Sequence, residues 1–299
     1  MELNRVLEGR NRDFKLLVLD IDGTIITNDR RLTRRTIEAI QRVKAAGIKV
    51  TVATGRQHPS AVHIARAIGI NAPLISSDGS MIQDLSTGET EIYPLDKEKA
   101  KRAVKMAEKY KGFRVEVFFE KTRYHAGEGY KRRLLKKYLT PPLRHSILGT
   151  LYYIRDFVCV PVEDKGDIDR TIAAIQEDPL KLAVYGYGPP EELVRYRQEL
   201  SDEFGSEISM TTALTHCVDV LEKGVSKAQG IAVVAEKLGI SSEQVITVGD
   251  NLNDIEMIQY AGLGVAMGNA SQQVKEKADY VTATNEEEGL AQFLEKLLA

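Results

Sequence analysis

Short apolar runs that end in polar, glycine-containing motifs recur near both ends of the chain, and a helical pattern follows each of them. Residues 14–19 form such a run, and residues 48–53 and 73–77 are two further predicted strands. Continuous apolar runs of this length are typical of strands that are buried on both faces. Helical patterns lie between them, over residues 33–47 and 58–68. This alternation with short connections predicts a parallel α/β sheet.

The middle of the chain has a different pattern, in which a hairpin over residues 81–93 is followed by helices interleaved with runs rich in Val, Tyr and Phe. The predicted helices are residues 97–110, 128–139, 168–176 and 191–204, and the predicted strands are 113–119, 157–162 and 182–185. From residue 225 the α/β alternation returns, with helices over 226–238, 253–260 and 287–298 and strands over 244–248 and 263–266. We therefore expect a core formed by residues 1–83 and 213–299, with an inserted α+β domain over 84–212.

The composition is that of an ordinary globular protein, with 43% hydrophobic and 28% charged residues, and the 299 residues suffice for about two domains. The segment before Phe14 is charged throughout and lacks the apolar stretch of a signal peptide. No apolar run approaches the roughly 20 residues of a membrane span. Cys159 and Cys217 stand in apolar surroundings, which indicates buried thiols and not a disulfide scaffold. We expect a cytoplasmic protein with no membrane partner.

Two aspartates, Asp20 and Asp22, follow the first predicted strand. Positions i and i+2 of an extended segment point the same way, so both carboxylates can face one pocket, and Gly23 allows a sharp turn after them. Asp and Gly also end strands in ordinary turns, which explains this pattern equally well when it is taken alone. A calcium-binding loop is excluded, because its twelfth position would be Arg31 instead of a glutamate.

A pair of carboxylates suits the hydrolysis of a phosphate ester. Asp20 would attack phosphorus and form an aspartyl phosphate. Asp22 would protonate the leaving oxygen and later take a proton from water. Two anions beside a phosphate repel it unless cations lie among them. The hypothesis therefore requires a metal ion and further positive groups.

Oxygen-bearing side chains follow a second predicted strand, residues 244–248. They are Asp250, Asn253 and Asp254. Hard oxygen ligands with no Cys or His cluster nearby favour Mg²⁺ over Zn²⁺. Capping of the next helix by Asn253 or Asp254 is the alternative, but it explains only one of the three residues. We therefore favour a metal site.

Groups that could hold a phosphate stand at two predicted helix starts. Thr54 and Gly55 follow the strand over residues 48–53 and offer a hydroxyl and a backbone amide. A simple strand-to-helix turn explains this pair as well. Lys227 opens a predicted helix, where a cation is unfavourable for the helix dipole unless an anion lies nearby. A solvated surface lysine is the alternative for Lys227.

Taken together and in this order, the motifs resemble the haloacid dehalogenase superfamily of phosphotransferases, and within it the Cof-type branch with a large C2-type α/β cap. The resemblance extends over nearly the whole chain. It is carried by Asp20–Thr24, Ala53–Arg56, Lys227 after Gly224–Ser226, Gly249–Asp254 with Met257, Val265–Ala270 and Ala278–Val281. The branch commonly has Asn-Gly-Ala where this chain has Asp78, Gly79 and Ser80, and the residues before Phe14 are an extension. We assign no function to that extension.

The resemblance implies a Rossmann-like, doubly wound parallel-sheet core and an α+β cap that closes over the site. It also implies a role for each matching position. The catalytic residues would be Asp20, Asp22, Thr54 and Lys227, with Asp20 as nucleophile and Asp22 as acid/base. Asp20, Asp250 and the carbonyl of Asp22 would bind Mg²⁺, and Asp254 would act on the metal indirectly or through water. The phosphate contacts would be Ile21 (backbone), Thr54, Gly55, Lys227 and Asn253. Lys227 would also neutralise Asp20. Preorganised charge of this kind is the expected main source of rate.

The substrate predicted from the resemblance is a small phosphorylated metabolite, especially a sugar phosphate. Residues 94–205 carry 22 Lys and Arg against 18 Asp and Glu, which is too small an excess to indicate nucleic-acid binding. Residues 131–137 are basic in the manner of a solvated helix face. Two alternatives stay open, a phosphomutase that uses the same aspartyl phosphate and a non-catalytic sugar-phosphate sensor. The sequence predicts neither the oligomeric state nor the cap residues that set specificity.

Overall fold

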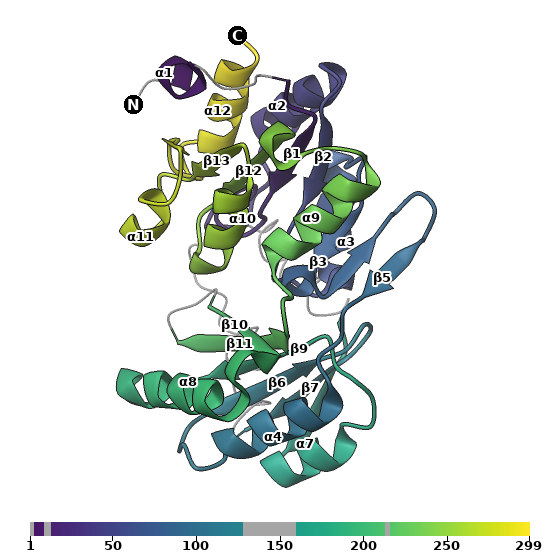
Figure 1. The fold of residues 1–299 in the computed structure, drawn as a ribbon, viewed down its shortest axis with the longest axis vertical. Helices are drawn as coiled ribbons and strands as arrows, with labels where there is room; N and C mark the ends of the chain where they lie inside the picture. Colours follow the sequence, from purple (N-terminus) through teal and green to yellow (C-terminus); the bar gives the residue numbers. More distant parts are fainter. Residues whose placement is uncertain (1–2, 9–12, 128–159, 213–215) are drawn as a thin grey trace. The chain divides into compact units, whose positions relative to one another are not determined.

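The computed structural model describes residues 3–8, 13–127, 160–212 and 216–299. The chain divides into two compact units, shown as a ribbon in Figure 1. The core unit comprises Met1–Arg56, Ala61–Glu91 and Ser226–Ala299, and the cap unit comprises Gln57–Ser60 and Ile92–Val225. The boundaries of these units differ by several residues from the predicted domain boundaries, which lie between residues 83 and 84 and between residues 212 and 213. The predicted boundaries of the functional domains stay a prediction.

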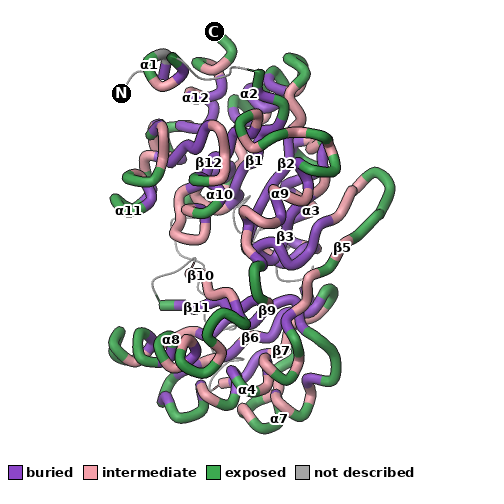
Figure 2. The backbone as a smooth tube through the Cα atoms, viewed as in Figure 1, coloured by how far each residue is buried: buried purple, intermediate pink, exposed green. Residues whose placement is uncertain are grey.

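A five-stranded parallel sheet forms the centre of the core unit, in the order β14-β13-β12-β1-β2. Its strands are β1 (Leu16–Leu19), β2 (Lys49–Val52), β12 (Val245–Gly249), β13 (Leu263–Ala266) and β14 (Tyr280–Val281). Every residue of β1, β12 and β13 is buried, as expected for strands with helices on both faces (Figure 2). The predicted strands 14–19, 48–53, 244–248 and 263–266 are therefore confirmed to within two residues.

The order of the strands shows that the core is doubly wound. From β1 the chain moves to β2 on one side, and from β12 it moves through β13 to β14 on the other. The predicted Rossmann-like core is thus confirmed. Because the direction of winding reverses between β1 and β12, the carboxyl ends of these two strands form the switch point where open α/β sheets bind ligands.

Three further strands, in the order β3-β4-β5, lie beyond β2. They are β3 (Leu74–Ser76), β4 (Met81–Gln83) and β5 (Thr90–Ile92), and a parallel bridge between Ala53 and Ile75 joins the end of β2 to β3. The 3-10 turn η1 (Ser77–Gly79) connects β3 to the predicted hairpin. This connection brings residue 78 next to the end of β2. There the amide of Asp78 donates a hydrogen bond to the carbonyl of Thr54 at 3.0 Å.

The helices of the core unit begin where the sequence provides caps. Thr33 accepts a hydrogen bond from the amide of Thr36, and Ser226 accepts one from the amide of Gln229. In this unit α2 packs against α12, and α9 against α10. The helices are α1 (Leu3–Leu7), α2 (Arg34–Ala45), α3 (His58–Ile68, of which 61–68 belong to this unit), α9 (Lys227–Lys237), α10 (Ile255–Tyr260), α11 (Gln272–Lys275) and α12 (Gly289–Leu297), with 3-10 turns η3 (Ser242–Gln244) and η4 (Leu252–Asp254).

The cap unit is α+β, as predicted, with a sheet in the order β10-β11-β9-β6-β7-β8. Its elements are α4 (Lys97–Ala107), β6 (Arg114–Phe118), β7 (Arg123–Ala126), β8 (Val162–Gly166), α7 (Ile168–Ala174), β9 (Lys181–Tyr185), α8 (Pro190–Phe204), η2 (Gly205–Glu207), β10 (Ile208–Thr211) and β11 (Cys217–Glu222). Alternate residues such as Val115, Leu182 and Val218 form one core with the helices. This unit also contains a buried ion pair, in which Nζ of Lys181 lies 2.9 Å from Oδ1 of Asp219.

Some predictions fall outside the described residues, namely the helix over 128–139, the basic run 131–137, most of the strand over 157–162 and Cys159. Cys217 is buried, as expected. Strands β7 and β10 were not predicted, because each has only four residues and mixes polar with apolar side chains. Among the helices that the structure describes, none has the length and apolar character needed to cross a membrane.

Candidate functional site at the switch point

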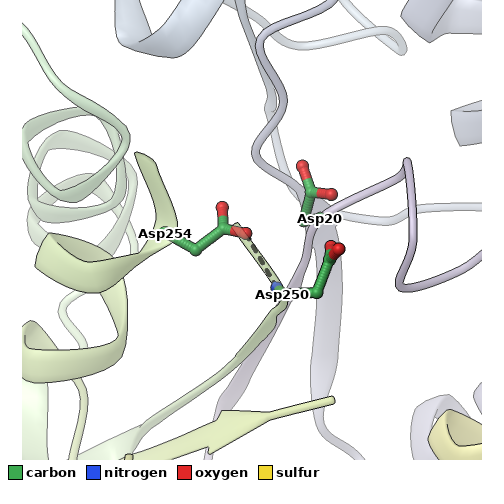
Figure 3. A group of neighbouring side chains, drawn as sticks. All are labelled: Asp20, Asp250 and Asp254. Carbon is green, nitrogen blue, oxygen red and sulfur yellow. Dashed lines mark hydrogen bonds between the residues drawn. The ribbon is translucent and has the colours of Figure 1, made fainter. Parts of the chain in front are cut away.

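The predicted acidic residues gather where β1 and β12 end. Asp20 follows β1, and its amide donates to the carbonyl of Val248 in β12 at 3.0 Å. Asp250 follows β12, and Asp254 ends the turn η4 that comes next. One carboxylate oxygen from each of the three aspartates lies within 4.8 Å of the others. Figure 3 shows their side chains approaching from two separate segments of the chain.

A buried lysine joins two of these carboxylates. The Nζ atom of Lys227, the first residue of α9, lies 2.7 Å from Oδ1 of Asp20 and 2.6 Å from Oδ1 of Asp254. Only 1% of the Lys227 side chain is exposed, so these are charge-assisted hydrogen bonds in a region shielded from water. The two carboxylates hold the pKa of Lys227 well above its usual value although burial lowers it. The alternative of a solvated surface lysine is therefore wrong.

The carboxylates of this cluster repel one another. Burial raises the pKa of Asp20 to about 7. The positive charge of Lys227 lowers this pKa, whereas the negative charges of Asp254 and Asp22 raise it. Burial and the charge of Asp20 raise the pKa of Asp250 to about 8. Carboxylate oxygens are the ligands that hard divalent cations prefer, and such a cation would relieve this repulsion. The residues present therefore fit a divalent metal ion.

Asp254 has a different environment from the other two acidic residues. Its Oδ2 accepts the backbone amides of Asp250 and Asn251, both at 2.9 Å, while its Oδ1 accepts from Lys227 (Figure 3 draws the bond to Asp250). Both oxygens are thus engaged within the protein. Asp254 therefore holds the loop that carries Asp250.

Two polar side chains that the sequence analysis did not assign support Asp250. The hydroxyl of Thr24 donates to Oδ1 of Asp250 at 3.2 Å, and Nδ2 of Asn269 lies 3.3 Å from Oδ2. The Asn269 amide also donates to the carbonyl of Gly23 at 3.0 Å. Both residues stand in the motifs that carry the family resemblance, but spacing alone does not show which carboxylate they contact.

Asp22 pairs with an arginine from the next strand end. The guanidinium of Arg56 donates from Nε to Oδ2 and from Nη2 to Oδ1 of Asp22, each at 2.6 Å. The side chain of Asp22 is 48% exposed, so the opposing effect of burial on its pKa is limited. The hydrogen bonds and charge of Arg56 outweigh it and hold the pKa of Asp22 below its usual value. Arg56 was part of the predicted motif without an assigned role, and it directly contacts the residue predicted as acid/base.

The predicted phosphate contacts lie around the same strand ends. Thr54 is 1% exposed, and its hydroxyl accepts the amide of Arg56 at 3.2 Å. The carbonyl of Ile21 accepts the amides of Ile25 and Ile26, which turns the chain sharply after Asp20. Asn253 donates from Nδ2 to Oδ1 of Asp78 at 2.9 Å, a contact that the sequence did not predict.

The chain is similar to proteins of one family over nearly its whole length. Residues 17–294 match the family described as haloacid dehalogenase-like hydrolase. The chain is 28% identical over 289 residues to the 5-amino-6-(5-phospho-D-ribitylamino)uracil phosphatase YitU of Bacillus subtilis, covering 94% of this chain and 96% of that protein. It is 26% identical over 281 residues to the pyridoxal phosphate phosphatase YbhA of Escherichia coli, covering 94% and 97%.

The fold is also shared with solved structures. A haloacid dehalogenase-like hydrolase from B. subtilis superposes with a TM-score of 0.78 at 26% identity, covering 94% of this chain and 99% of that one. The predicted resemblance to the haloacid dehalogenase superfamily and its Cof-type branch is confirmed. Since the family match spans nearly the whole chain and its motifs meet at one switch point, this chain belongs to the haloacid dehalogenase-like hydrolases.

Proposed function

We propose that the chain is a Mg²⁺-dependent phosphatase that hydrolyses a small phosphorylated metabolite through an aspartyl phosphate on Asp20. The observation that carries this proposal is the buried contact of Lys227 with both Asp20 and Asp254, at 2.7 and 2.6 Å. It holds a carboxylate nucleophile and a cation together at the carboxyl end of β1.

The chemistry uses the two aspartates in turn. A carboxylate oxygen of Asp20 forms a bond to phosphorus while the bond from phosphorus to the ester oxygen breaks, and Asp22 gives that oxygen a proton. Water then attacks the same phosphorus, Asp22 takes a proton from the water, and the bond to Asp20 breaks. Lys227 would offset the charge of the transferring oxygens. The ligands we propose for Mg²⁺ are Asp20, Asp250 and the carbonyl of Asp22, and the ion supplies positive charge beside the phosphoryl group.

Removing the arginine beside Asp22 should change the pH dependence of turnover. Arg56 lowers the pKa of Asp22, so Arg56→Gln raises it, and protonated Asp22 persists to higher pH. The lowered pKa of Asp22 places the alkaline limb of kcat/KM at acidic pH in the wild type. We expect this limb to move to higher pH in Arg56→Gln, and kcat/KM at its optimum to fall roughly tenfold to a hundredfold as Asp22 loses its fixed position. Arg35→Gln, which removes an exposed ion pair with Glu295, is the matched control. An unmoved alkaline limb in Arg56→Gln would count against Asp22 as the acid.

The turn after Asp22 offers a second test. Gly23 has φ +87°, and a Cβ there would lie 2.2 Å from Oδ2 of Asp250. We expect Gly23→Ala to lower the free energy of unfolding by about 2–3 kcal/mol and to remove most turnover. Gly47 has φ +88° but nothing within 4 Å of the same position, so Gly47→Ala should lose only about 1 kcal/mol and keep its activity. Urea denaturation and turnover assays measure both, and equal effects would contradict a close approach to Asp250.

The substrate class is proposed from the family, with sugar phosphates first. Relatives named for their substrates act on a phosphorylated ribitylamino-uracil and on pyridoxal phosphate. Both are small phosphate monoesters, and each carries a heterocycle. The test panel therefore includes sugar phosphates, these two esters and nucleotides.

The decisive experiment measures phosphate release from this panel by the wild-type protein, with Mg²⁺ and with EDTA. Mg²⁺-dependent release from at least one ester is the expected result. Tight binding of an ester without release would favour the sugar-phosphate sensor. Movement of the phosphoryl group within a sugar, without free phosphate, would favour a phosphomutase.

A further inference from the structure

One buried carboxylate of the core unit has no part in the proposed chemistry. Asp78 is 1% exposed and lies in the turn η1 between β3 and β4. Its Oδ1 accepts a hydrogen bond from Nδ2 of Asn253 at 2.9 Å. A Cβ built on Gly55 would lie 3.0 Å from both Asp78 oxygens, so the carboxylate lies directly against that glycine. Its charge also acts on Lys227.

Asp78 thus lies against Gly55 and Asn253 and acts electrostatically on Lys227. These three proposed phosphate contacts come from three separate segments of the chain. Gly55 follows β2, Asn253 follows β12, and Lys227 begins α9. A phosphate dianion is repelled by a nearby carboxylate, so a buried aspartate beside the phosphate ligands weakens phosphate binding. Such a residue is favourable for the site only if another of its interactions compensates for this loss.

The backbone around Asp78 is held in a strained shape. Ser77 and Asp78 have φ of +51° and +56°, a region that side chains other than glycine rarely adopt. The amide of Ser77 donates to the carbonyl of Arg56 at 2.9 Å, and that of Asp78 to Thr54 at 3.0 Å. A Cβ on Gly79 would lie 2.2 Å from the carbonyl oxygen of Ser226. The turn is therefore fixed at both sides, and strain of this kind persists where the surrounding structure demands one conformation.

We propose that Asp78 is a positioning residue of the phosphate site, whose carboxylate fixes the Asn253 side chain with its nitrogen, and not its oxygen, available to the substrate phosphate. This rests on the proposed function, which makes Asn253 a phosphate contact. An amide nitrogen carries two hydrogens. One is donated to Asp78, and the other is the donor that a phosphate oxygen needs.

The hydrogen-bond partners available to the Asn253 side chain support this orientation. Its Oδ1 is buried and has no hydrogen-bond partner within the described protein. Rotating the amide by half a turn would place that oxygen against the Asp78 carboxylate, which offers only acceptors. Two acceptors in contact, one of them charged, are less favourable than one unsatisfied oxygen. Asp78 therefore selects one of two orientations that the amide group alone would not distinguish.

The test is a double-mutant cycle on the affinity for inorganic phosphate in the presence of Mg²⁺, measured by calorimetry. We expect Asp78→Ala to weaken phosphate binding about tenfold in the otherwise unchanged protein. In an Asn253→Ala background this loss should disappear, because the group that Asp78 positions is gone, and removal of the negative charge should leave the affinity unchanged or tighter. With an active ester, KM should rise by a similar factor while kcat changes little.

A purely structural role would instead give the same loss in both backgrounds. Three outcomes would overturn the proposal. They are an equal loss in both backgrounds, an unchanged or tighter affinity in Asp78→Ala alone, and no phosphate binding by the wild type. Asp279→Ala, which removes a carboxylate that accepts the amide of Gly264, is the control for general destabilisation and should leave phosphate affinity unchanged. If Asp78→Ala does not fold, the same cycle with the isosteric Asp78→Asn decides. An amide at this position can donate as well as accept, so it no longer selects one orientation of Asn253, and its loss of charge acts equally in both backgrounds.

The two proposals can fail separately. Phosphate binding with the expected coupling, but no ester hydrolysed, would refute the phosphatase and keep the positioning role. Hydrolysis without coupling between positions 78 and 253 would do the reverse.

Discussion

Asp20→Asn is expected to abolish phosphate release, with a loss of at least about 10⁴-fold in kcat at saturating Mg²⁺. An amide oxygen is a poor nucleophile, and the covalent route has no substitute because Asp22 is held by Arg56 at 2.6 Å. Asparagine has the same shape, so Lys227 keeps a neighbouring oxygen. Equal turnover by the wild type and Asp20→Asn would exclude the mechanism, and circular dichroism of both proteins checks that the fold is unchanged.

The same substitution should stabilise the protein in EDTA. Burial raises the pKa of Asp20 to about 7 from 3.8, so the folded state binds more protons than the unfolded state between these values. Stability therefore falls as the pH rises from about 4 to about 7, and the penalty is complete above pH 7. Asp20→Asn removes this contribution. We expect its free energy of unfolding in EDTA to exceed that of the wild type at pH 8 and to approach it near pH 4, as measured by urea denaturation.

The location of the site could be predicted from the sequence because it depends on a general property of parallel sheets. Asp20 and Asp250 each follow a short, mainly apolar run, and the carboxyl ends of neighbouring parallel strands meet. What had to be assumed was that β1 and β12 are neighbours although more than 200 residues separate them. Their direct pairing, with Leu16 opposite Val245, is what brings the two aspartates together.

The partners of these carboxylates could not be predicted in the same way. Arg56 faces Asp22 because the turn after β2 folds back toward the end of β1, and no periodicity in the sequence records that turn. Asp78 reaches Asn253 only because two consecutive residues adopt positive φ, which side chains other than glycine seldom do. Contacts of this kind depend on tertiary structure, whereas strand ends are visible in the pattern of apolar residues.

Lys227→Met is expected to be the most damaging single substitution for stability. It leaves Asp20 and Asp254, which are 4% and 0% exposed, without the cation that lies 2.7 and 2.6 Å from them. Removing one partner of a buried ion pair costs about 3–5 kcal/mol, because the remaining charge is left in a poorly solvated region. We expect a loss of this size at pH 7 in EDTA, together with a fall of about 10³-fold in kcat.

The pH and Mg²⁺ dependence of Lys227→Met should identify the cause of that loss. The raised pKa of Lys227 means that its stabilising contribution is complete at any pH below about 10.5, so the wild type has it throughout the accessible range. In the variant the pKa of Asp20 must rise further, and the instability should therefore grow as the pH rises from 5 to 8. Mg²⁺ should stabilise the variant more than the wild type, because it then supplies the missing positive charge.

Lys181→Met is the matched control, because Lys181 is also a buried lysine paired with an aspartate, Asp219, at 2.9 Å. It lies in the cap unit, outside the acidic cluster of Asp20, Asp250 and Asp254. We expect it to lose stability as well, but to gain no more from Mg²⁺ than the wild type does. A loss below about 1 kcal/mol in Lys227→Met, or equal rescue of both variants by Mg²⁺, would show that Lys227 is not the cation that offsets these buried carboxylates.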